Sequence, residues 1–211
     1  MTLNTNDSLV RWPVTLAGLV CAAAYALLAH ASQQASGAGL FFMLLCCLVT
    51  GSLTLGIFLG STRGAIKLSC TDVLLFAVLF RLIGLAAYPI LEDDHFRFLW
   101  DGWMTVTQGT PYGSVPSDWF DSSAVPERFE YLLDGINYPN VPTIYGPTAQ
   151  LLFALSAYVA PGSLIPIKLL VFAADLLVLC LLARMATTRW LLLYGWSFLL
   201  IKELAFTAHI D

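Results

Sequence analysis

Residues 38–60 read AGLFFMLLCCLVTGSLTLGIFLG, an apolar run that contains no charged side chain. A helix of about 20 such residues is long enough to cross the hydrocarbon core of a bilayer. Similar apolar stretches occupy residues 13–31, 70–90, 164–184 and 190–206. The sequence therefore predicts an all-α polytopic membrane protein with about five transmembrane helices, in which the whole chain forms a single membrane domain.

The overall composition supports a membrane environment. The chain is 58% hydrophobic and 11% charged, whereas soluble domains average about 25% charged residues. The formal net charge of −4 argues against nucleic acid as a partner, because nucleic-acid binding normally requires basic patches. The acidic excess is local, since residues 92–134 contain nine of the fourteen Asp and Glu.

The basic residues next to the apolar stretches indicate an orientation. Positive charge accumulates in cytoplasmic loops, and the flanking basic residues here are Arg11, Arg63, Lys67, Arg184 and Arg189. If these are cytoplasmic, the region 91–163 faces outward. The short apolar run 148–160 then forms a re-entrant or interfacial half-helix, because a full crossing would move the last two arginines outside. A run of this length is typical of such a segment.

The loop at residues 91–147 is the only large extramembrane part that the sequence predicts. It is rich in Pro, Gly, Asp and Tyr, and it contains turn-forming stretches. Residues 94–107 have the pattern of a short amphipathic helix whose aromatic side chains suit a membrane interface. We therefore expect a large outer loop that carries short helices.

The stretch Glu92-Asp93-Asp94-His95 begins this loop. Three consecutive carboxylates repel one another, which favours a compensating cation or a shared proton. A carboxylate held in such a setting can act as a general base. The alternative is helix N-capping, because acidic residues are favoured at the start of a helix.

Arg97 extends this pattern along the predicted helix. Asp93 and Asp101 lie four residues on either side of Arg97, so one helix face would carry an acid, a base and a second acid. Such a face could hold an anionic group through the guanidinium while presenting a carboxylate. The alternative is a local ladder of surface salt bridges.

Two charges fall inside predicted membrane spans. Arg81 lies midway along the third apolar stretch and Asp175 midway along the fourth. Charges inside a membrane are costly and are usually paired or functional. We expect a structural pair between them, with a role in a substrate pathway as the alternative.

A cluster of polar residues ends the chain: Lys202, Glu203, His209 and Asp211. In the predicted topology this end lies on the outer side, where an ammonium could bind phosphate and the last two side chains could orient a sugar or a metal. The alternative is that these are charges which extend from the end of a span towards the interface.

Tyr138 and Tyr145 lie in the part of the loop that leads into the predicted half-helix. Tyrosine combines a flat apolar ring with a hydroxyl group that forms hydrogen bonds. Both are candidate sugar-binding residues, although tyrosine is also common at membrane interfaces.

Residues 91–102, LEDDHFRFLWDG, resemble the first outer loop of GT-C membrane glycosyltransferases, and most of all the bacterial polyprenol-phosphate-mannose-dependent mannosyltransferases. The stretches 109–112 (GTPY), 138–139 (YP) and 144–147 (IYGP) are similar to the same loop, as is the end of the chain at 202–203 and 209–211. The similarity covers roughly residues 85–211. Members of that family continue for several more spans, so we expect this chain to be truncated at its C-terminus relative to them.

The resemblance implies a function. It implies inverting transfer of a sugar, a hexose such as mannose, from a polyprenyl-phosphate donor to a glycan or glycolipid acceptor on the outer face of the bacterial inner membrane. Asp93 or Asp94 would be the base that deprotonates the acceptor hydroxyl. Arg97 and Lys202 would neutralise the leaving phosphate.

Other functions fit the same sequence. Glu92, His95 and Asp101 are further candidates for substrate binding, and no metal ligand is assigned, although acid clusters can bind Mg²⁺ or Mn²⁺ through oxygen. A transporter or flippase of lipid-linked sugars would instead depend on Arg81, Asp175 and Lys202. A non-catalytic membrane assembly subunit is the third possibility.

Overall fold

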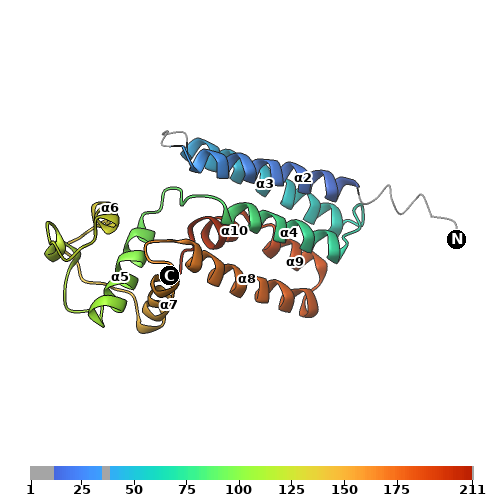
Figure 1. Ribbon diagram of the computed structural model, residues 1–211. Helices are drawn as coiled ribbons and strands as arrows, with labels where there is room; N and C mark the ends of the chain where they lie inside the picture. The colour runs from blue at the N-terminus through green and yellow to red at the C-terminus, as the bar shows by residue number, and fades with distance from the viewer. Residues whose placement is uncertain (1–11, 35–38, 211) are drawn as a thin grey trace. The chain divides into compact units, whose positions relative to one another are not determined.

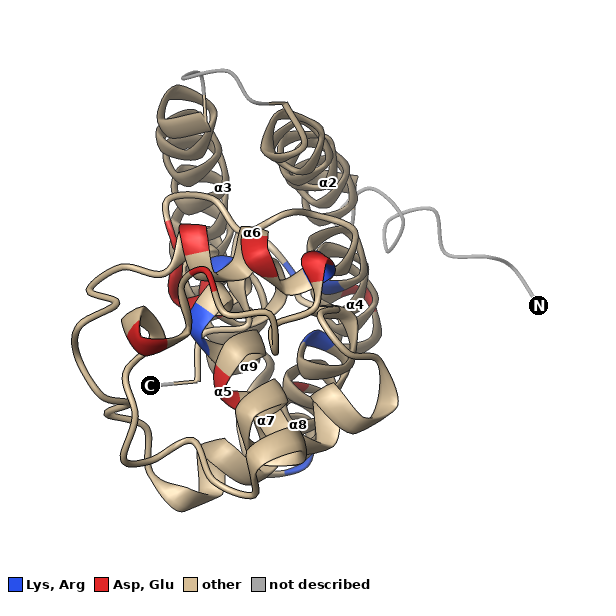
Figure 2. Cartoon of the chain, turned by 60° about the vertical axis from the view of Figure 1, so that its left-hand side comes forward, with Lys and Arg blue, Asp and Glu red and all other residues tan. Residues whose placement is uncertain are grey.

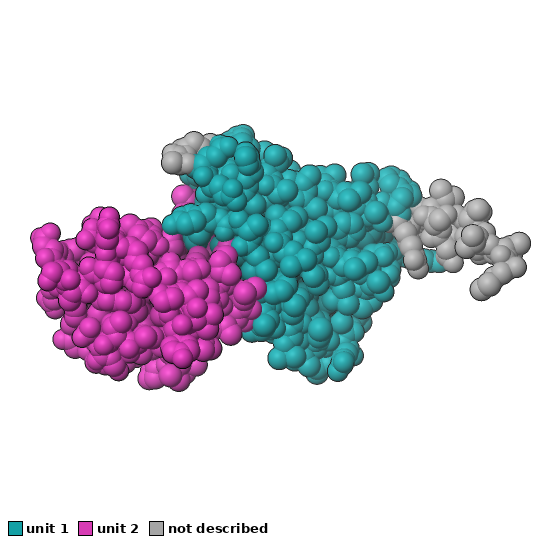
Figure 3. All heavy atoms as spheres, viewed as in Figure 1, with its two compact units in different colours: residues 1–90, 172–206 teal, residues 91–171, 207–211 magenta. Residues whose placement is uncertain are grey.

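A computed structural model of the protein describes residues 12–34 and 39–210 (Figure 1). The described residues form helices and contain no strand. The chain divides into two compact units (Figure 3), and the first contains residues 1–90 and 172–206. The second contains residues 91–171 and 207–211, so it begins where the outer loop was predicted to begin.

Unit 1 is built from apolar helices. They are α2 (Trp12–Ser32), α3 (Gly39–Thr62), α4 (Cys70–Leu85), the later part of α8 (Ile165–Met185), α9 (Thr188–Gly195) and α10 (Phe198–Ile201). α2 packs against α3 and α4, and α9 packs against α3 and α4 (Figure 1). An aromatic cluster fills the space between them, in which Phe80 contacts the rings of Tyr25 and Trp196.

Three helices among the described residues are long and apolar enough to cross a membrane: α2, α3 and α8. A fourth candidate is the pair Thr188–Gly195 and Phe198–Thr207, if this bent pair is a single span. Large apolar side chains such as Phe41, Leu48 and Leu177 are exposed on these helices. Because lipid is a suitable environment for such faces, the long apolar helices fit a membrane-embedded protein.

The number of spans differs from the predicted five, since the described residues provide three, or four with the bent pair. The predicted span at 70–90 forms only the 16-residue helix α4. At a rise of 1.5 Å per residue this helix is about 24 Å long, which is shorter than a typical hydrocarbon core. Pro89 lies four residues beyond Leu85, where α4 ends, and it has no N–H group to donate to the Leu85 carbonyl, so a regular helix cannot continue through it.

The predicted span at 190–206 is interrupted. α9 ends at Gly195, α10 begins at Phe198, and the two parts meet at an angle of 49°. A break in an apolar environment leaves backbone carbonyls that need donors. Here the Arg81 guanidinium donates to the Gly195 carbonyl at 2.7 Å, and Thr54 Oγ1 donates to the Trp196 carbonyl at 3.5 Å.

The predicted pair between Arg81 and Asp175 is confirmed. Arg81 Nε donates to Asp175 Oδ2, and the Tyr194 hydroxyl donates to Asp175 Oδ1 at 2.7 Å. The two charged side chains are 0% and 2% exposed. Arg81 also donates to the Ala77 carbonyl within its own helix at 3.0 Å. This pair therefore joins α4, α8 and the break after α9.

Unit 2 holds the shorter helices. They are α5 (Asp94–Gln108), a 3-10 turn (Pro116–Trp119), α6 (Glu127–Gly135), α7 (Pro147–Val159) and the first turns of α8. α7 is the short apolar helix predicted at 148–160. α5 packs on α6 and very closely on α7, because a Cβ atom at Gly102 would lie 2.4 Å from the Phe153 carbonyl oxygen. Only glycine allows this approach.

We predict that breaking the buried pair destabilises unit 1. Asp175→Asn or Arg81→Met should lower the free energy of unfolding by about 3–5 kcal/mol, because each leaves a buried charge without its partner. Thermal unfolding of the full chain in detergent micelles measures the change. The double variant R81M/D175L should recover part of the loss, and Arg184→Met, at an exposed arginine of α8, should have little effect. Wild-type stability in Asp175→Asn would contradict this role.

Candidate functional site

The acidic stretch lies at the start of α5. Leu91 has a left-handed backbone with φ of 57°, and Glu92 and Asp93 precede the first helical residue, Asp94. Asp93 occupies the N-cap position, but its side chain makes no capping hydrogen bond. Its carboxylate instead accepts a hydrogen bond from the Asn137 side-chain amide. Helix capping therefore does not account for Asp93.

A small cavity of about 150 Å³ opens beside this helix start. Both candidate bases and the candidate cation lie in its wall. The wall includes Asp93, Asp94, Arg97, Asn137, Tyr138 and Tyr145. Small-molecule pockets usually measure about 300–1,000 Å³, so this cavity is large enough for only part of a ligand.

Arg97 binds the segment around Val141, which lines the same cavity. Its Nε donates to Asp101 Oδ1 at 2.9 Å, and both terminal nitrogens donate to the Val141 carbonyl at 3.0 Å. A guanidinium has five N–H donors, and these contacts among the described residues use three of them. Arg97 therefore positions the segment around Val141 and also lies at the cavity.

Asp101 is buried behind Arg97 with 1% of its surface exposed. Besides Arg97, its carboxylate accepts hydrogen bonds from the Thr143 hydroxyl and from Gln150 Nε2, the latter at 2.8 Å. Burial raises the pKa of this carboxyl, and the hydrogen bonds from Thr143 and Gln150 and the charge of Arg97 act in the opposite direction. In this structure Asp101 joins α5, α7 and the loop between α6 and α7.

We predict that Asp101→Asn destabilises unit 2. The new amide group would place N–H donors against those of Gln150 or Arg97, so at least one charge-assisted hydrogen bond would be lost, at a cost of about 2–3 kcal/mol. Thermal unfolding in micelles measures this cost. Glu127→Gln, an exposed acid on α6, is the matched control and should leave the midpoint unchanged. An equal midpoint in both variants would show that the network contributes nothing.

His95 is buried in the first turn of α5. Its Nδ1 lies 3.1 Å from the Glu92 carbonyl, so Nδ1 carries the proton in this contact because a carbonyl only accepts. The imidazole packs on the Phe96 ring with 4.1 Å between centroids. Burial lowers the pKa of His95 below its ordinary 6.5, as does the charge of Lys168, while the Glu92 contact and Asp93 oppose the shift.

This shift predicts a dependence of stability on pH. Because the native state keeps His95 neutral to lower pH than the unfolded chain does, the unfolded chain binds more protons between the two pKa values. The contribution of His95 to stability is complete above pH 6.5 and is lost as the pH falls through the lowered native pKa.

The unfolding midpoint of the wild type should therefore fall more steeply between about pH 7 and about pH 5 than that of His95→Asn. Asparagine keeps a donor for the Glu92 carbonyl but does not titrate. His30→Asn, at an exposed histidine of α2, should behave like the wild type. Parallel curves for the wild type and His95→Asn would contradict the assignment.

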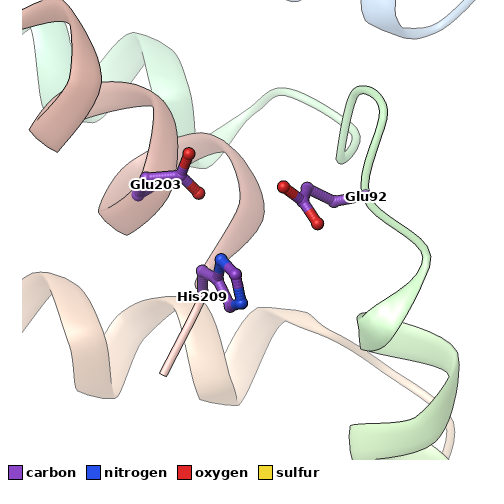
Figure 4. Close-up of side chains that lie close together, drawn as sticks. All are labelled: Glu92, Glu203 and His209. Carbon is purple, nitrogen blue, oxygen red and sulfur yellow. The ribbon is translucent and has the colours of Figure 1, made fainter. Parts of the chain in front are cut away.

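His209 lies next to the acidic stretch within unit 2. Its Nε2 is 3.5 Å from Asp94 Oδ2, and a ligand atom of its ring lies within 4.8 Å of a Glu92 carboxylate oxygen (Figure 4). Imidazole and carboxylate groups at this spacing are able to contribute to a divalent-metal site. Glu92 and His209 could thus contribute ligands to a metal ion.

The remaining predicted residues belong to unit 1 or lie outside the described part of the chain. Lys202 and Glu203 belong to unit 1, where the ammonium and carboxylate form an ion pair of 3.0 Å. Asp211 and Arg11 lie outside the described residues. The predicted roles of these residues in binding stay predictions.

The two tyrosines differ in their surroundings. Tyr138 is 78% exposed and has a left-handed backbone with φ of 53°. Tyr145 packs edge-on against Phe98 and Phe153, with centroid distances of 5.1 Å and 5.4 Å. Tyr138 is therefore available to a ligand, whereas Tyr145 is a fixed part of the wall.

Two residues of the site were not selected from the sequence. Asn137 lies in the loop between α6 and α7, and its side-chain amide donates to Asp93. Gln150 binds Asp101 from a buried position in α7. The signal for Gln150 was a long amide side chain in a mostly apolar helix, because buried polar groups need partners.

Taken together, the fold is that of an all-α protein with several long apolar helices suited to a membrane, joined to a unit with an acidic cavity. Figure 2 shows many of the acidic residues gathered around α5 and α6. No protein-family model, curated protein or solved structure matches the chain.

Proposed function

We propose that the protein is a membrane glycosyltransferase that moves a sugar from a polyprenyl-phosphate donor to a hydroxyl acceptor. One observation carries the proposal: Asp93, Asp94 and Arg97 line the same cavity. A transfer of this kind needs a base for the acceptor hydroxyl and positive charge near the departing phosphate. The similarity of residues 91–102 to GT-C transferases supports the same reaction.

The proposed reaction is a single displacement. Asp93 or Asp94 takes the proton of the acceptor hydroxyl while its oxygen forms a bond to the anomeric carbon of the sugar. The bond between that carbon and the phosphate oxygen breaks, and the lipid phosphate leaves with the electron pair. Arg97 is placed to stabilise the negative charge through N–H groups that its protein contacts do not use.

The two carboxylates are not equivalent. Asp93 accepts a hydrogen bond from the Asn137 side-chain amide, which fixes the direction of its carboxylate. Asp94 lies beside His209, whose protonation would stabilise a negative charge on Asp94. We assign the role of base to either member of this pair, with the other member orienting the acceptor.

The proposed topology follows from the basic residues. Unit 2 faces outward, α7 is a re-entrant or interfacial helix, and α4 completes five crossings by local thinning of the bilayer, which short helices can induce. The partners are the lipid-linked donor, a glycan or glycolipid acceptor and the bilayer. A transport pathway through Arg81 and Asp175 is less favoured, because the two charges neutralise each other in a buried pair.

The test is a transfer assay with the purified full chain and polyprenyl-phosphate mannose. Asp93→Asn and Asp94→Asn should each be examined, and the variant that removes the base should lower the rate about 100-fold or more. Arg97→Gln should also slow transfer, since the departing phosphate loses its nearest cation in this cavity.

Glu127→Gln is the control, because Glu127 is an exposed acid of unit 2 that lines neither this cavity nor the larger one described below. Unfolding midpoints of all variants show whether a loss of activity reflects a loss of structure. If Asp93→Asn and Asp94→Asn both transfer sugar at the wild-type rate, the proposed mechanism is wrong.

A further inference from the structure

Unit 2 contains a second cavity that is larger than the one at the acidic stretch. It measures about 710 Å³ and lies between the turn at 119–123 and α6. This volume is within the range of about 300–1,000 Å³ of small-molecule sites, whereas the cavity at Asp93 and Asp94 is smaller than that range. The larger cavity is available for a ligand that the smaller one cannot contain.

The walls of this cavity are held in place. Glu130, Leu133 and Asp134 line it from one face of α6, as their spacing of three and four residues requires. The opposite wall is formed by Trp119 and Phe120, and Trp119 packs edge-on against Trp103 of α5 with 6.2 Å between centroids.

The connecting turn is ordered by backbone hydrogen bonds. The Ser122 amide donates to the Trp119 carbonyl at 3.2 Å, and the Val125 amide donates to the Ser122 carbonyl at 3.0 Å. Asp121, which lies between Trp119 and Ser122 in the chain, has a left-handed backbone with φ of 59°. The turn therefore presents the Asp121 carboxylate and the serine hydroxyls from a defined backbone.

The chemistry of the lining selects a class of ligand. Its charged members are Asp121, Glu130 and Asp134, and none of the described lining residues is basic. An anionic group such as a phosphate would be repelled. The three carboxylates do not come together as a group of metal ligands within the described part of the chain. A single divalent cation is therefore not the expected occupant.

A neutral saccharide fits these walls. Carboxylates and serine hydroxyls accept hydrogen bonds from sugar hydroxyls, and an aromatic ring offers an apolar face to the C–H groups of a pyranose. Phe120, which is 41% exposed, provides such a face. We propose that this cavity binds the saccharide part of the acceptor, an inference that rests on the proposed transferase function.

The experiment measures binding without donor or catalysis. The purified full chain in detergent micelles is titrated with three neutral disaccharides, α-mannobiose, maltose and N,N′-diacetylchitobiose, by saturation-transfer NMR and by tryptophan fluorescence. At least one should bind. Glu130→Gln and Phe120→Ala should each weaken it about tenfold, since each removes one hydrogen-bond acceptor or one apolar contact.

Glu127→Gln supplies the matched control, because Glu127 and Glu130 are both exposed acids of α6 and only Glu130 lines the cavity. Glu127→Gln should bind the saccharide as the wild type does. The inference is overturned if none of the three saccharides binds, if Glu130→Gln binds as tightly as the wild type, or if Ca²⁺ binds in a Glu130-dependent way and the saccharides do not.

Asp94→Asn separates this inference from the proposed function. It should keep saccharide binding, because Asp94 lines the other cavity. Whichever of Asp93→Asn and Asp94→Asn removes the base should lose transfer. If saccharide binding depends on Glu130 while Asp93→Asn and Asp94→Asn both keep full transfer activity, the binding site is supported and the mechanism is refuted. If Asp94→Asn loses transfer but the wild type binds none of the saccharides, the mechanism is supported and the saccharide site is refuted.

Discussion

Unit 1 depends on the hydrogen bonds of the buried Arg81 guanidinium. One buried side chain neutralises Asp175 of α8 and donates to the carbonyl of Gly195, where α9 ends. An interrupted helix among apolar neighbours would otherwise leave carbonyl groups without donors, and an isolated charge there would be more costly still. The Arg81 guanidinium thus supplies a donor to the carbonyl at the break, and Asp175 supplies the opposite charge to Arg81. This explains how the chain tolerates both the break and the buried charges.

Unit 2 depends in the same way on α5. Its Gly102 allows close contact with α7, its buried Asp101 binds donors from the loop and from α7, and its Arg97 holds the Val141 carbonyl. These contacts fix the position of the helix start, so the carboxylates of Asp93 and Asp94 are presented from a rigid element. A site that must align a base with a reacting hydroxyl benefits from such support.

The two cavities of unit 2 have complementary linings. The smaller one combines carboxylates with Arg97 and suits a reaction in which an anion departs. The larger one combines carboxylates with aromatic rings and contains no basic residue among its described lining. Under the proposed function, the reacting centre would lie at the smaller cavity and the acidic lining of the larger cavity would bind a neutral saccharide, whose distant contacts would supply the orientation.

Local sequence was sufficient to predict the helical class, the long apolar helices α2, α3 and α8, the short helix α7 and the pair between Arg81 and Asp175. These follow from apolar length and from the cost of an unpaired charge, which are properties of local sequence. The length of an apolar run did not predict the early end of α4 or the break after Gly195. Mean hydropathy contains no information on which backbone hydrogen bonds form. The hydrogen bonds from Asn137 to Asp93 and from Gln150 to Asp101 are visible only in the folded chain, because they join residues 44 and 49 positions apart. The larger cavity beside α6 likewise depends on how the turn at 119–123 folds back towards that helix.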